Sequence, residues 1–186
     1  GALKASKLKA NELAGIGVGI AGQVDAARGV LVGTPNLSQA VVDLPIAARL
    51  RERFGVPAAL RNDVQIAAVG ERSFGAGKGV DDFVCGFVGT GVGGAIVRGG
   101  ELLSGAAGSA GEIGHLVVDA GGRLCGCGGH GHLEAYASRT AITSSLLGDL
   151  KRGRPSTLRE LVPELDPANP GAGNTAIRSG VLAKAV

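Results

Sequence analysis

The chain has 186 residues and a formal net charge of +3; 45% of its residues are apolar, 3% are aromatic and 34 are glycine. Its length allows one domain or parts of two. Apart from residues 151–154 its basic residues are spread out and give no support to nucleic-acid binding. No apolar run approaches the ~18 residues of a membrane span. Three cysteines, two of them one residue apart, cannot form a disulfide framework, which favours a cytoplasmic location.

The glycines lie between short apolar segments, which is typical of an α/β protein with ligand-binding loops. Strands are expected at residues 13–21, where apolar residues alternate with glycine, and at residues 29–32. A helix is expected over residues 43–55, with Asp43 as its N-cap and Gly55 as its stop signal.

A short strand at residues 57–60 leads through Asn62 and Asp63 into a helix at residues 64–74. Open α/β sheets place ligand chemistry where the carboxyl end of a strand enters a helix. The competing interpretation is that Asp63 only caps the helix. The local sequence leaves both interpretations open.

Two further strands, the first of them buried, are expected at residues 82–88 and 93–98, with a glycine-rich loop at 89–94 between them. Such a loop is either a plain hairpin connection or a phosphate cradle formed by backbone N–H groups. The Gly99-Gly100 pair predicts a tight turn that pairs residues 101–103 back onto the sheet.

Residues 111–134 contain all three histidines and two of the three cysteines of the chain. Histidine and cysteine are the preferred protein ligands of zinc, so this segment predicts a zinc-stapled loop. Two carboxylates, Glu112 and Glu134, flank the ligands. The histidines and cysteines are His115, Cys125, Cys127, His130 and His132.

After this cluster, helices are expected at residues 133–147 and 156–162. A last helix is expected to start at Asn174 and to place Ile177 and Val181 on one apolar face. The sequence supplies no partner for that face, so we expect the chain to stop within its architecture.

Five motifs, in this order and at this spacing, resemble the ROK family (repressors, open reading frames and sugar kinases). They are Thr-Pro-Asn-Leu at 34–37, Asn-Asp-x-x-x-Ala-Ala-x-Gly-Glu at 62–71, Gly-Thr-Gly-Val-Gly-Gly at 89–94, Ala-Gly-Glu-Ile-Gly-His at 110–115 and Cys-Gly-Cys-Gly-x-x-Gly-His-Leu-Glu at 125–134. The resemblance covers the central portion of a glucokinase-like member.

The resemblance implies an α/β protein with the actin-like, ribonuclease-H-like, two-lobed sugar kinase fold, incomplete at both ends. Residues 1–63 would be a remnant of the N-terminal lobe, ending at the catalytic Asp63. Residues 64–186 would begin the C-terminal lobe and carry the zinc-binding loop. The implied activity is phosphorylation of a hexose by ATP, with Mg²⁺, in a homodimer.

The resemblance also assigns site residues. Asp63 matches the catalytic base, which takes the proton of the attacking sugar hydroxyl. The residues that match sugar-binding positions are Asn36, Asn62, Asp63, Glu112, His115 and Glu134. The residues that match the phosphate-binding loop are Gly89, Thr90, Gly91, Gly93 and Gly94.

The implied zinc site departs from the family pattern of one histidine and three cysteines. His115, Cys125 and Cys127 match, but His132 stands where the family has its last cysteine. Two cysteines and two histidines still form a good structural zinc site. His130 is a competing fourth ligand, and a loop without metal is the remaining alternative.

Two family features are absent from the sequence: the Asp-x-Gly-Gly-Thr phosphate loop and the adenosine-binding region. We therefore expect this chain alone not to phosphorylate sugars efficiently. One alternative is the effector-binding part of a ROK transcriptional repressor, which would bind nucleic acid through a helix-turn-helix outside these residues. Another alternative is an inactive remnant.

Overall fold

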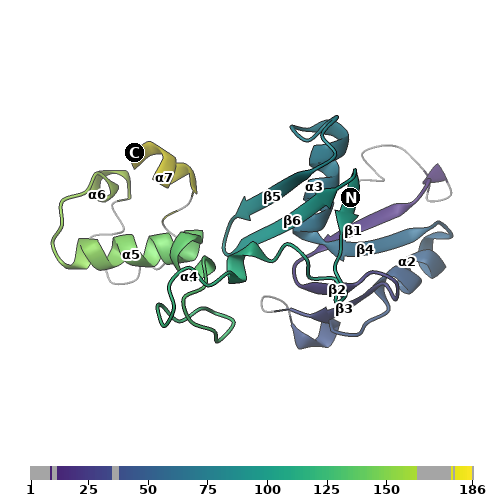
Figure 1. Cartoon of the computed structure of the whole chain (residues 1–186), viewed down its shortest axis with the longest axis horizontal. Coiled ribbons are helices and arrows are strands. Elements are labelled where there is room, and N and C mark those ends of the chain that lie inside the picture. The colour runs from purple at the N-terminus through teal and green to yellow at the C-terminus, as the bar shows by residue number, and fades with distance from the viewer. Residues whose placement is uncertain (1–8, 10–11, 35–37, 163–176, 178, 186) are drawn as a thin grey trace. The chain divides into compact units, whose positions relative to one another are not determined.

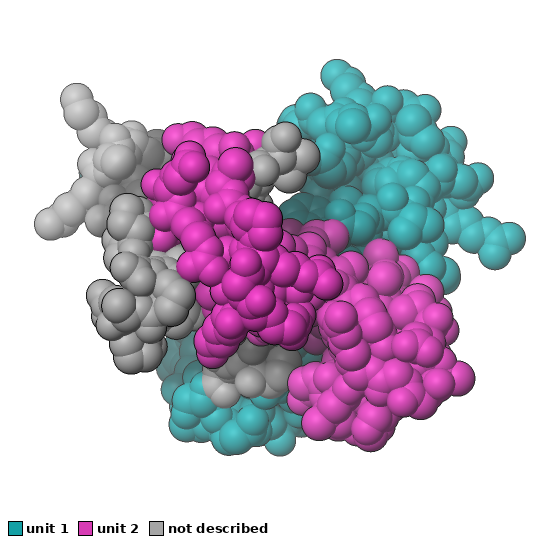
Figure 2. Space-filling model, turned by 90° about the vertical axis from the view of Figure 1, so that its left-hand side faces the viewer, with its two compact units in different colours: residues 1–87, 93–112 teal, residues 88–92, 113–186 magenta. Residues whose placement is uncertain are grey.

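The computed structural model describes residues 9, 12–34, 38–162, 177 and 179–185. It contains two compact units, drawn in different colours in Figure 2. Unit 1 comprises Gly1–Phe87 and Gly93–Glu112, and unit 2 comprises Val88–Val92 and Ile113–Val186. The boundary expected at residue 63 concerns the lobes of a longer fold and stays a prediction.

The described residues in the first part of unit 1 form two strand pairs, a short 3-10 helix and an α-helix (Figure 1). Its elements are β1 (Ile16–Ile20), β2 (Gln23–Asp25), β3 (Val30–Gly33), the 3-10 helix η2 (Gln39–Val41), α2 (Ile46–Phe54) and β4 (Ala58–Asn62). β1 runs parallel to β4, and β2 runs antiparallel to β3. Val24, Leu31 and Leu60 form the buried core of this part. Because Ile20 pairs with Asn62, the carboxyl ends of β1 and β4 lie together.

The helix expected over residues 43–55 ends as predicted but starts later. Gly55 adopts the left-handed conformation that closes α2, with φ of 68°. The prediction that Asp43 caps this helix is wrong, because α2 begins at Ile46 and its N-cap is Pro45. The Asp43 N–H instead donates to the Leu31 carbonyl at 2.8 Å, which ties residue 43 to β3.

The second part of unit 1 packs a helix against a three-stranded sheet of order β5-β6-β7. Its elements are α3 (Asp63–Phe74), β5 (Phe83–Val88), β6 (Val92–Arg98) and β7 (Glu101–Leu103). The turn predicted at Gly99-Gly100 is confirmed, with φ of 58° and 78°. The prediction of a buried strand at residues 82–88 is wrong. β5 lies at the sheet edge, and its Val84 and Val88 are 61% and 65% exposed.

Unit 2 is a loop followed by helices. Its helices are the 3-10 helix η3 (Ile113–His115), α4 (Glu134–Ala137), α5 (Arg139–Lys151), α6 (Leu158–Leu161) and α7 (Ser179–Ala185). The single helix expected at residues 133–147 is two helices, because Ser138 is extended, with ψ of 152°. The buried Ser138 hydroxyl accepts the Ala141 N–H at 3.1 Å and so caps α5.

The last segment of the chain has a packing partner, contrary to the sequence-based prediction. Ile177, 1% exposed, joins a buried cluster with Leu150, Leu158 and Val162, and Val181 packs against it. The cap expected at Asn174 lies outside the described residues. Of the helices formed by the described residues, none combines the length and the apolar character needed to cross a membrane.

Candidate functional site

Asn62, not Asp63, caps helix α3. The Asn62 Oδ1 accepts the N–H groups of Val64 at 2.9 Å and Gln65 at 3.2 Å, and its Nδ2 donates to the Gly22 carbonyl at 3.1 Å. The interpretation of Asp63 as the cap is therefore wrong. Asp63 is the first residue of the helix, and its carboxylate is exposed. Within the described part of the chain, this carboxylate accepts one hydrogen bond, from the N–H of the adjacent Val64 to Oδ1.

The other residues expected at the sugar lie in both units. Glu112 is exposed at the end of unit 1, whereas His115 and Glu134 belong to unit 2. Asn36 lies outside the described residues. Glu112 follows Gly111, where any side chain would collide with the backbone of β6 at Ala95, and the φ of 92° also favours glycine. The close approach to β6 explains the glycine at position 111 of the Ala-Gly-Glu-Ile-Gly-His motif.

The glycine-rich loop connects β5 and β6, and the first turn of α5 holds it in place. The Arg139 backbone N–H donates to the Gly89 carbonyl at 2.9 Å. The Thr140 hydroxyl donates to the Thr90 carbonyl at 2.8 Å, and the Arg139 guanidinium donates to Thr90 Oγ1 at 3.1 Å. The loop is therefore more than a strand connection: three bonds fix it to a helix.

The same loop contacts Glu134 at Gly91 and Val92. The Val92 N–H donates to Glu134 Oε2 at 2.8 Å. A Cβ added at Gly91 would collide with this carboxylate, so the close contact requires glycine there. Within unit 1, a Cβ at Gly93 would collide with the Val64 side chain. Two of the loop's glycines thus serve close packing.

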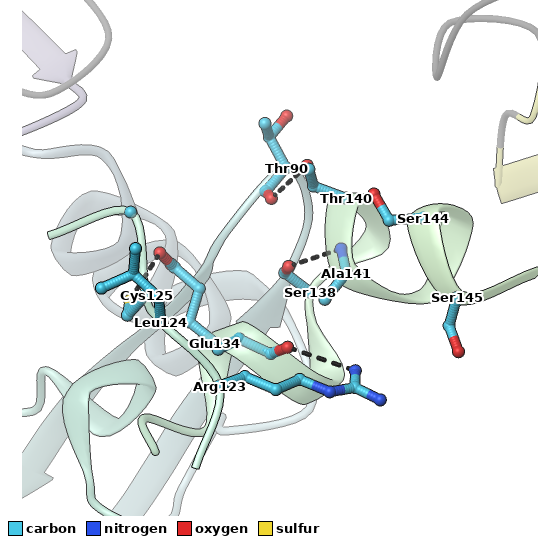
Figure 3. A pocket seen from close by; sticks show the side chains of 12 residues that line it. Thr90, Arg123, Leu124, Cys125, Glu134, Ser138, Thr140, Ala141, Ser144 and Ser145 are labelled. Atoms are coloured by element: carbon cyan, nitrogen blue, oxygen red, sulfur yellow. Dashed lines mark hydrogen bonds between the residues drawn. The ribbon is translucent and has the colours of Figure 1, made fainter. Parts of the chain in front are cut away.

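A cavity of about 480 Å³ lies in unit 2 beside this loop (Figure 3). Hydroxyl groups dominate its polar lining, together with one carboxylate and one guanidinium. The lining residues with hydroxyl, carboxylate or guanidinium groups are Thr90, Arg123, Glu134, Ser138, Thr140, Ser144 and Ser145. Such a lining can donate to and accept from a polar, oxygen-rich ligand.

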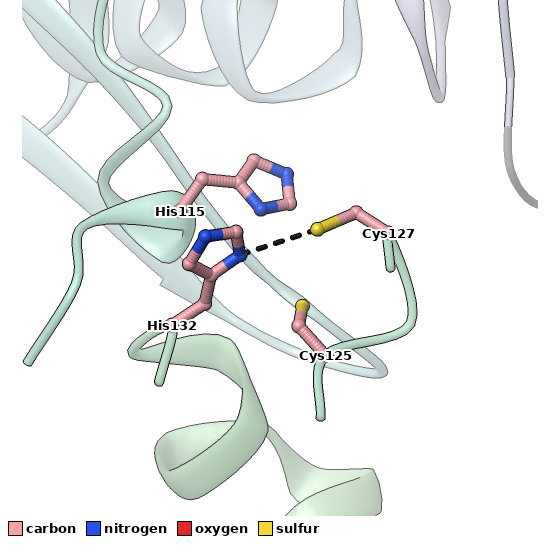
Figure 4. Close-up of side chains that lie close together, drawn as sticks. All are labelled: His115, Cys125, Cys127 and His132. Carbon is pink, nitrogen blue, oxygen red and sulfur yellow. Dashed lines mark hydrogen bonds between the residues drawn. The ribbon is translucent and has the colours of Figure 1, made fainter. Parts of the chain in front are cut away.

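Four of the five expected histidines and cysteines meet at one point (Figure 4). One ligand atom from each of His115, Cys125, Cys127 and His132 lies within 4.8 Å of the others. Cys127 Sγ and His132 Nδ1 are 3.2 Å apart. The competing ligand His130 is exposed and does not belong to this group.

Backbone bonds set the register of this loop. The Cys125 N–H donates to the Gly129 carbonyl at 2.8 Å, and the Gly131 N–H donates to the Arg123 carbonyl at 2.8 Å. Gly131 is left-handed, with φ of 71°. This tight turn directs His132 toward the cysteines although histidine is longer than cysteine (Figure 4).

A tyrosine joins the loop to α4. The Tyr136 hydroxyl donates to Asp119 at 2.8 Å and accepts the Arg123 N–H at 2.7 Å. Burial raises the pKa of the Cys125 thiol. The side chains of Cys127 and Glu134 raise it further, against the lowering effect of the Cys127 backbone N–H.

The donor set fits zinc. Two sulfurs and two ring nitrogens are its usual structural ligands, and atoms at tetrahedral corners about 2.0–2.3 Å from the ion lie roughly 3.3–3.8 Å apart. The observed maximum of 4.8 Å requires only small side-chain rotations. The residues present can therefore hold such an ion.

Comparison with known proteins identifies the family: the sequence matches the ROK family over residues 2–182. The chain belongs to the ROK family. A glucokinase from Thermotoga maritima is 38% identical over 146 residues, which are 78% of this chain and 46% of that protein. The chain spans about half the length of such ROK relatives.

Solved ROK structures share the fold. A ROK family glucokinase from Streptomyces griseus, in complex with glucose and AMPPNP, matches with a TM-score of 0.75 and 33% identity, over 94% of this chain and 53% of that one. A ROK family transcriptional regulator, a homologue of the E. coli MLC protein, matches with a TM-score of 0.76 and 30% identity, over 86% and 39%. The predicted actin-like, ribonuclease-H-like α/β fold is confirmed, and this ROK chain contains part of it.

Sequence reasoning missed the first turn of α5, because it assumed one continuous helix through Ser138. Arg139 and Thr140, which hold the glycine-rich loop, therefore had no assigned role. One signal was available: an arginine directly after a serine cap occupies the helix end where a cation is least favoured.

Proposed function

We propose that the complete protein is an ATP-dependent hexose kinase of the glucokinase type. The observation that carries this proposal is that Asn62 caps α3 while the neighbouring Asp63 does not. Because Asn62 supplies the helix cap, the Asp63 carboxylate is exposed and available to a substrate. The similarity of the chain to the glucokinases from Thermotoga maritima and Streptomyces griseus supports the same activity.

In this mechanism Asp63 is the general base. A sugar hydroxyl oxygen bonds to the γ-phosphorus of ATP, its proton passes to the Asp63 carboxylate, and ADP leaves with the electron pair of the broken bond. Mg²⁺ accompanies ATP as the co-substrate. Carboxylates suit this task because they accept the proton as the hydroxyl becomes a nucleophile.

The sugar-binding groups are amides, carboxylates and an imidazole, which match a ring of hydroxyls that each donate and accept. We assign this role to Asn36, Asn62, Asp63, Glu112, His115 and Glu134. We assign the phosphates of ATP to the loop formed by Gly89, Thr90, Gly91, Gly93 and Gly94. In unit 2 the bond from Val92 to Glu134 supports the neighbouring position of these two functions.

We also propose that His115, Cys125, Cys127 and His132 hold a structural zinc ion. When bound, zinc supplies a fixed cross-link between these four side chains and takes no part in proton transfer. The chain's own residues then orient the site: Glu134 begins α4 directly after this loop, and the Tyr136 hydroxyl bonds the loop to that helix.

The test is a phosphorylation assay of the complete protein with ATP against a panel of hexoses and N-acetylhexosamines. We expect turnover of at least one hexose, with glucose foremost. If none is phosphorylated although the protein is folded, the kinase proposal is wrong. An assay of this 186-residue chain alone is a weaker test, since it spans about half of the relatives' length.

The second candidate function is a sugar-responsive transcriptional repressor, and one observation favours it: the structural similarity to a ROK transcriptional regulator. The two candidates differ upstream of these residues. A DNA-binding helix-turn-helix there indicates a repressor, a phosphate loop indicates a kinase, and neither indicates an inactive remnant. The homodimer and the cytoplasmic location stay predictions.

A further inference from the structure

Among the described residues, Arg139 is the one cationic side chain that hydrogen-bonds to the glycine-rich loop. Its guanidinium donates to Thr90 Oγ1 at 3.1 Å, and its backbone N–H donates to the Gly89 carbonyl at 2.9 Å. The next residue, Thr140, donates to the Thr90 carbonyl at 2.8 Å. The start of α5 therefore fixes both Gly89 and Thr90 and places a charged side chain beside them.

This arginine is electrostatically costly where it stands. It is the first residue of α5, and the helix macrodipole disfavours a cation at that end. In the described part of the chain, the ion pairs formed by arginines involve Arg28, Arg72, Arg152 and Arg154, and none involves Arg139. Thr90 accepts one of its five N–H donors, and the remainder are suited to a multi-oxygen anion.

Side chains of opposite charge contact the same loop two residues apart. Glu134 accepts the N–H of Val92, and Arg139 donates to Thr90. A phosphate seated on Gly89 and Thr90 would meet the guanidinium, while the Glu134 carboxylate is bonded to the Val92 N–H. This arrangement suits a reaction in which a sugar hydroxyl and a polyphosphate meet along one short segment.

We propose that Arg139 is a phosphate-positioning residue, which exchanges its bond to the Thr90 hydroxyl for bonds to the phosphate oxygens of the bound nucleotide. This inference rests on the proposed kinase function and adds a charged side chain to a loop whose assigned members are four glycines and Thr90. A guanidinium suits this role better than an ammonium, because it can bind two phosphate oxygens at once.

The experiment compares Arg139→Gln, Arg139→Lys and the control Arg152→Gln in the complete protein. Arg152 lies at the opposite end of α5, where it pairs with Asp149. We expect Arg139→Gln to raise the KM for ATP about tenfold to a hundredfold, since a charge-assisted bond is lost, and to leave the KM for sugar within about twofold. Arg139→Lys recovers part of the loss, and Arg152→Gln has no effect. An unchanged KM for ATP in Arg139→Gln overturns the inference.

Calorimetric titration with inorganic tripolyphosphate separates this inference from the kinase proposal. Binding that weakens in Arg139→Gln but not in Arg152→Gln supports the inference even if no sugar is phosphorylated, in which case the kinase proposal alone fails. Sugar phosphorylation together with Arg139-independent tripolyphosphate binding overturns the inference alone. Absence of both phosphorylation and binding overturns both.

Discussion

Asn62 and Asp63 are consecutive residues with separate tasks: Asn62 Oδ1 accepts the Val64 N–H at 2.9 Å as the cap of α3, and the Asp63 carboxylate is exposed. We therefore expect Asp63→Asn to reduce turnover of the complete protein about 10²–10⁴-fold, the usual contribution of a general base. Sugar binding should change little, because the asparagine amide can still hydrogen-bond a sugar hydroxyl. The free energy of unfolding should also change little, because the cap is intact. Steady-state kinetics and urea unfolding measure both quantities.

The matched variant is Asn62→Ala. Loss of an N-cap costs about 1 kcal/mol of the free energy of unfolding, and the bond to the Gly22 carbonyl is lost with it. If Asp63→Asn proved the more destabilising of the two variants, the assignment of Asn62 as the cap would be wrong. If Asp63→Asn kept full turnover, the assignment of Asp63 as the base would be wrong.

The contact between Gly91 and Glu134 predicts a defect of sugar binding with little loss of stability. A Cβ at Gly91 collides with the end of the flexible Glu134 side chain, which can move away and so gives up the Val92 N–H. We expect Gly91→Ala to raise the sugar KM about tenfold, as for the loss of one hydrogen bond to a charged group.

The control is Gly148→Ala, in the last turn of α5, where the added Cβ meets only an ordinary contact at 3.5 Å. Alanine has a higher helix propensity than glycine, so this variant should unfold at a slightly higher urea concentration. Its KM for sugar should be unchanged. An equal sugar KM in both variants would mean that the position of Glu134 does not affect the sugar.

Local rules predicted those features that depend on single residues. Gly55 ends α2 and Gly99-Gly100 turns the chain because the left-handed backbone conformation strongly favours glycine. The clustering of His115 and the two cysteines was also predictable, because ligand chemistry does not depend on the path of the chain between them.

Features decided by tertiary contacts were not predictable in this way. Asp43 has good capping chemistry, but its N–H is bonded to Leu31 of β3, a contact between segments that no local pattern reveals. The exposure of Val84 depends on the position of β5 at the sheet edge. The sequence of a single strand does not determine the order of the strands in the sheet.

Ser138 separates α4 from α5, and its hydroxyl caps α5 from a buried position. We expect Ser138→Ala to lower the free energy of unfolding by about 1 kcal/mol, because the Ala141 N–H loses its acceptor. Ser145→Ala, at an exposed position of the same helix, should be neutral or slightly stabilising. Equal stability of the two variants in urea unfolding would exclude a capping role for Ser138.

The meeting of His132 with Cys127, 3.2 Å apart, makes the metal site testable by substitution. We expect about one zinc per chain by metal analysis, as for a site with four protein ligands. His132→Cys should retain the ion, because cysteine is also a zinc ligand, whereas His132→Ala should lose it and lower the unfolding temperature. His130→Ala is the control and should keep its zinc, since His130 lies outside the group.

Cobalt substitution then reports the ligands: His132→Cys should strengthen the thiolate-to-metal absorption, and His130→Ala should leave it unchanged. Loss of metal from His130→Ala but not from His132→Ala would assign the fourth ligand to His130, and a fully folded chain without metal would refute the site.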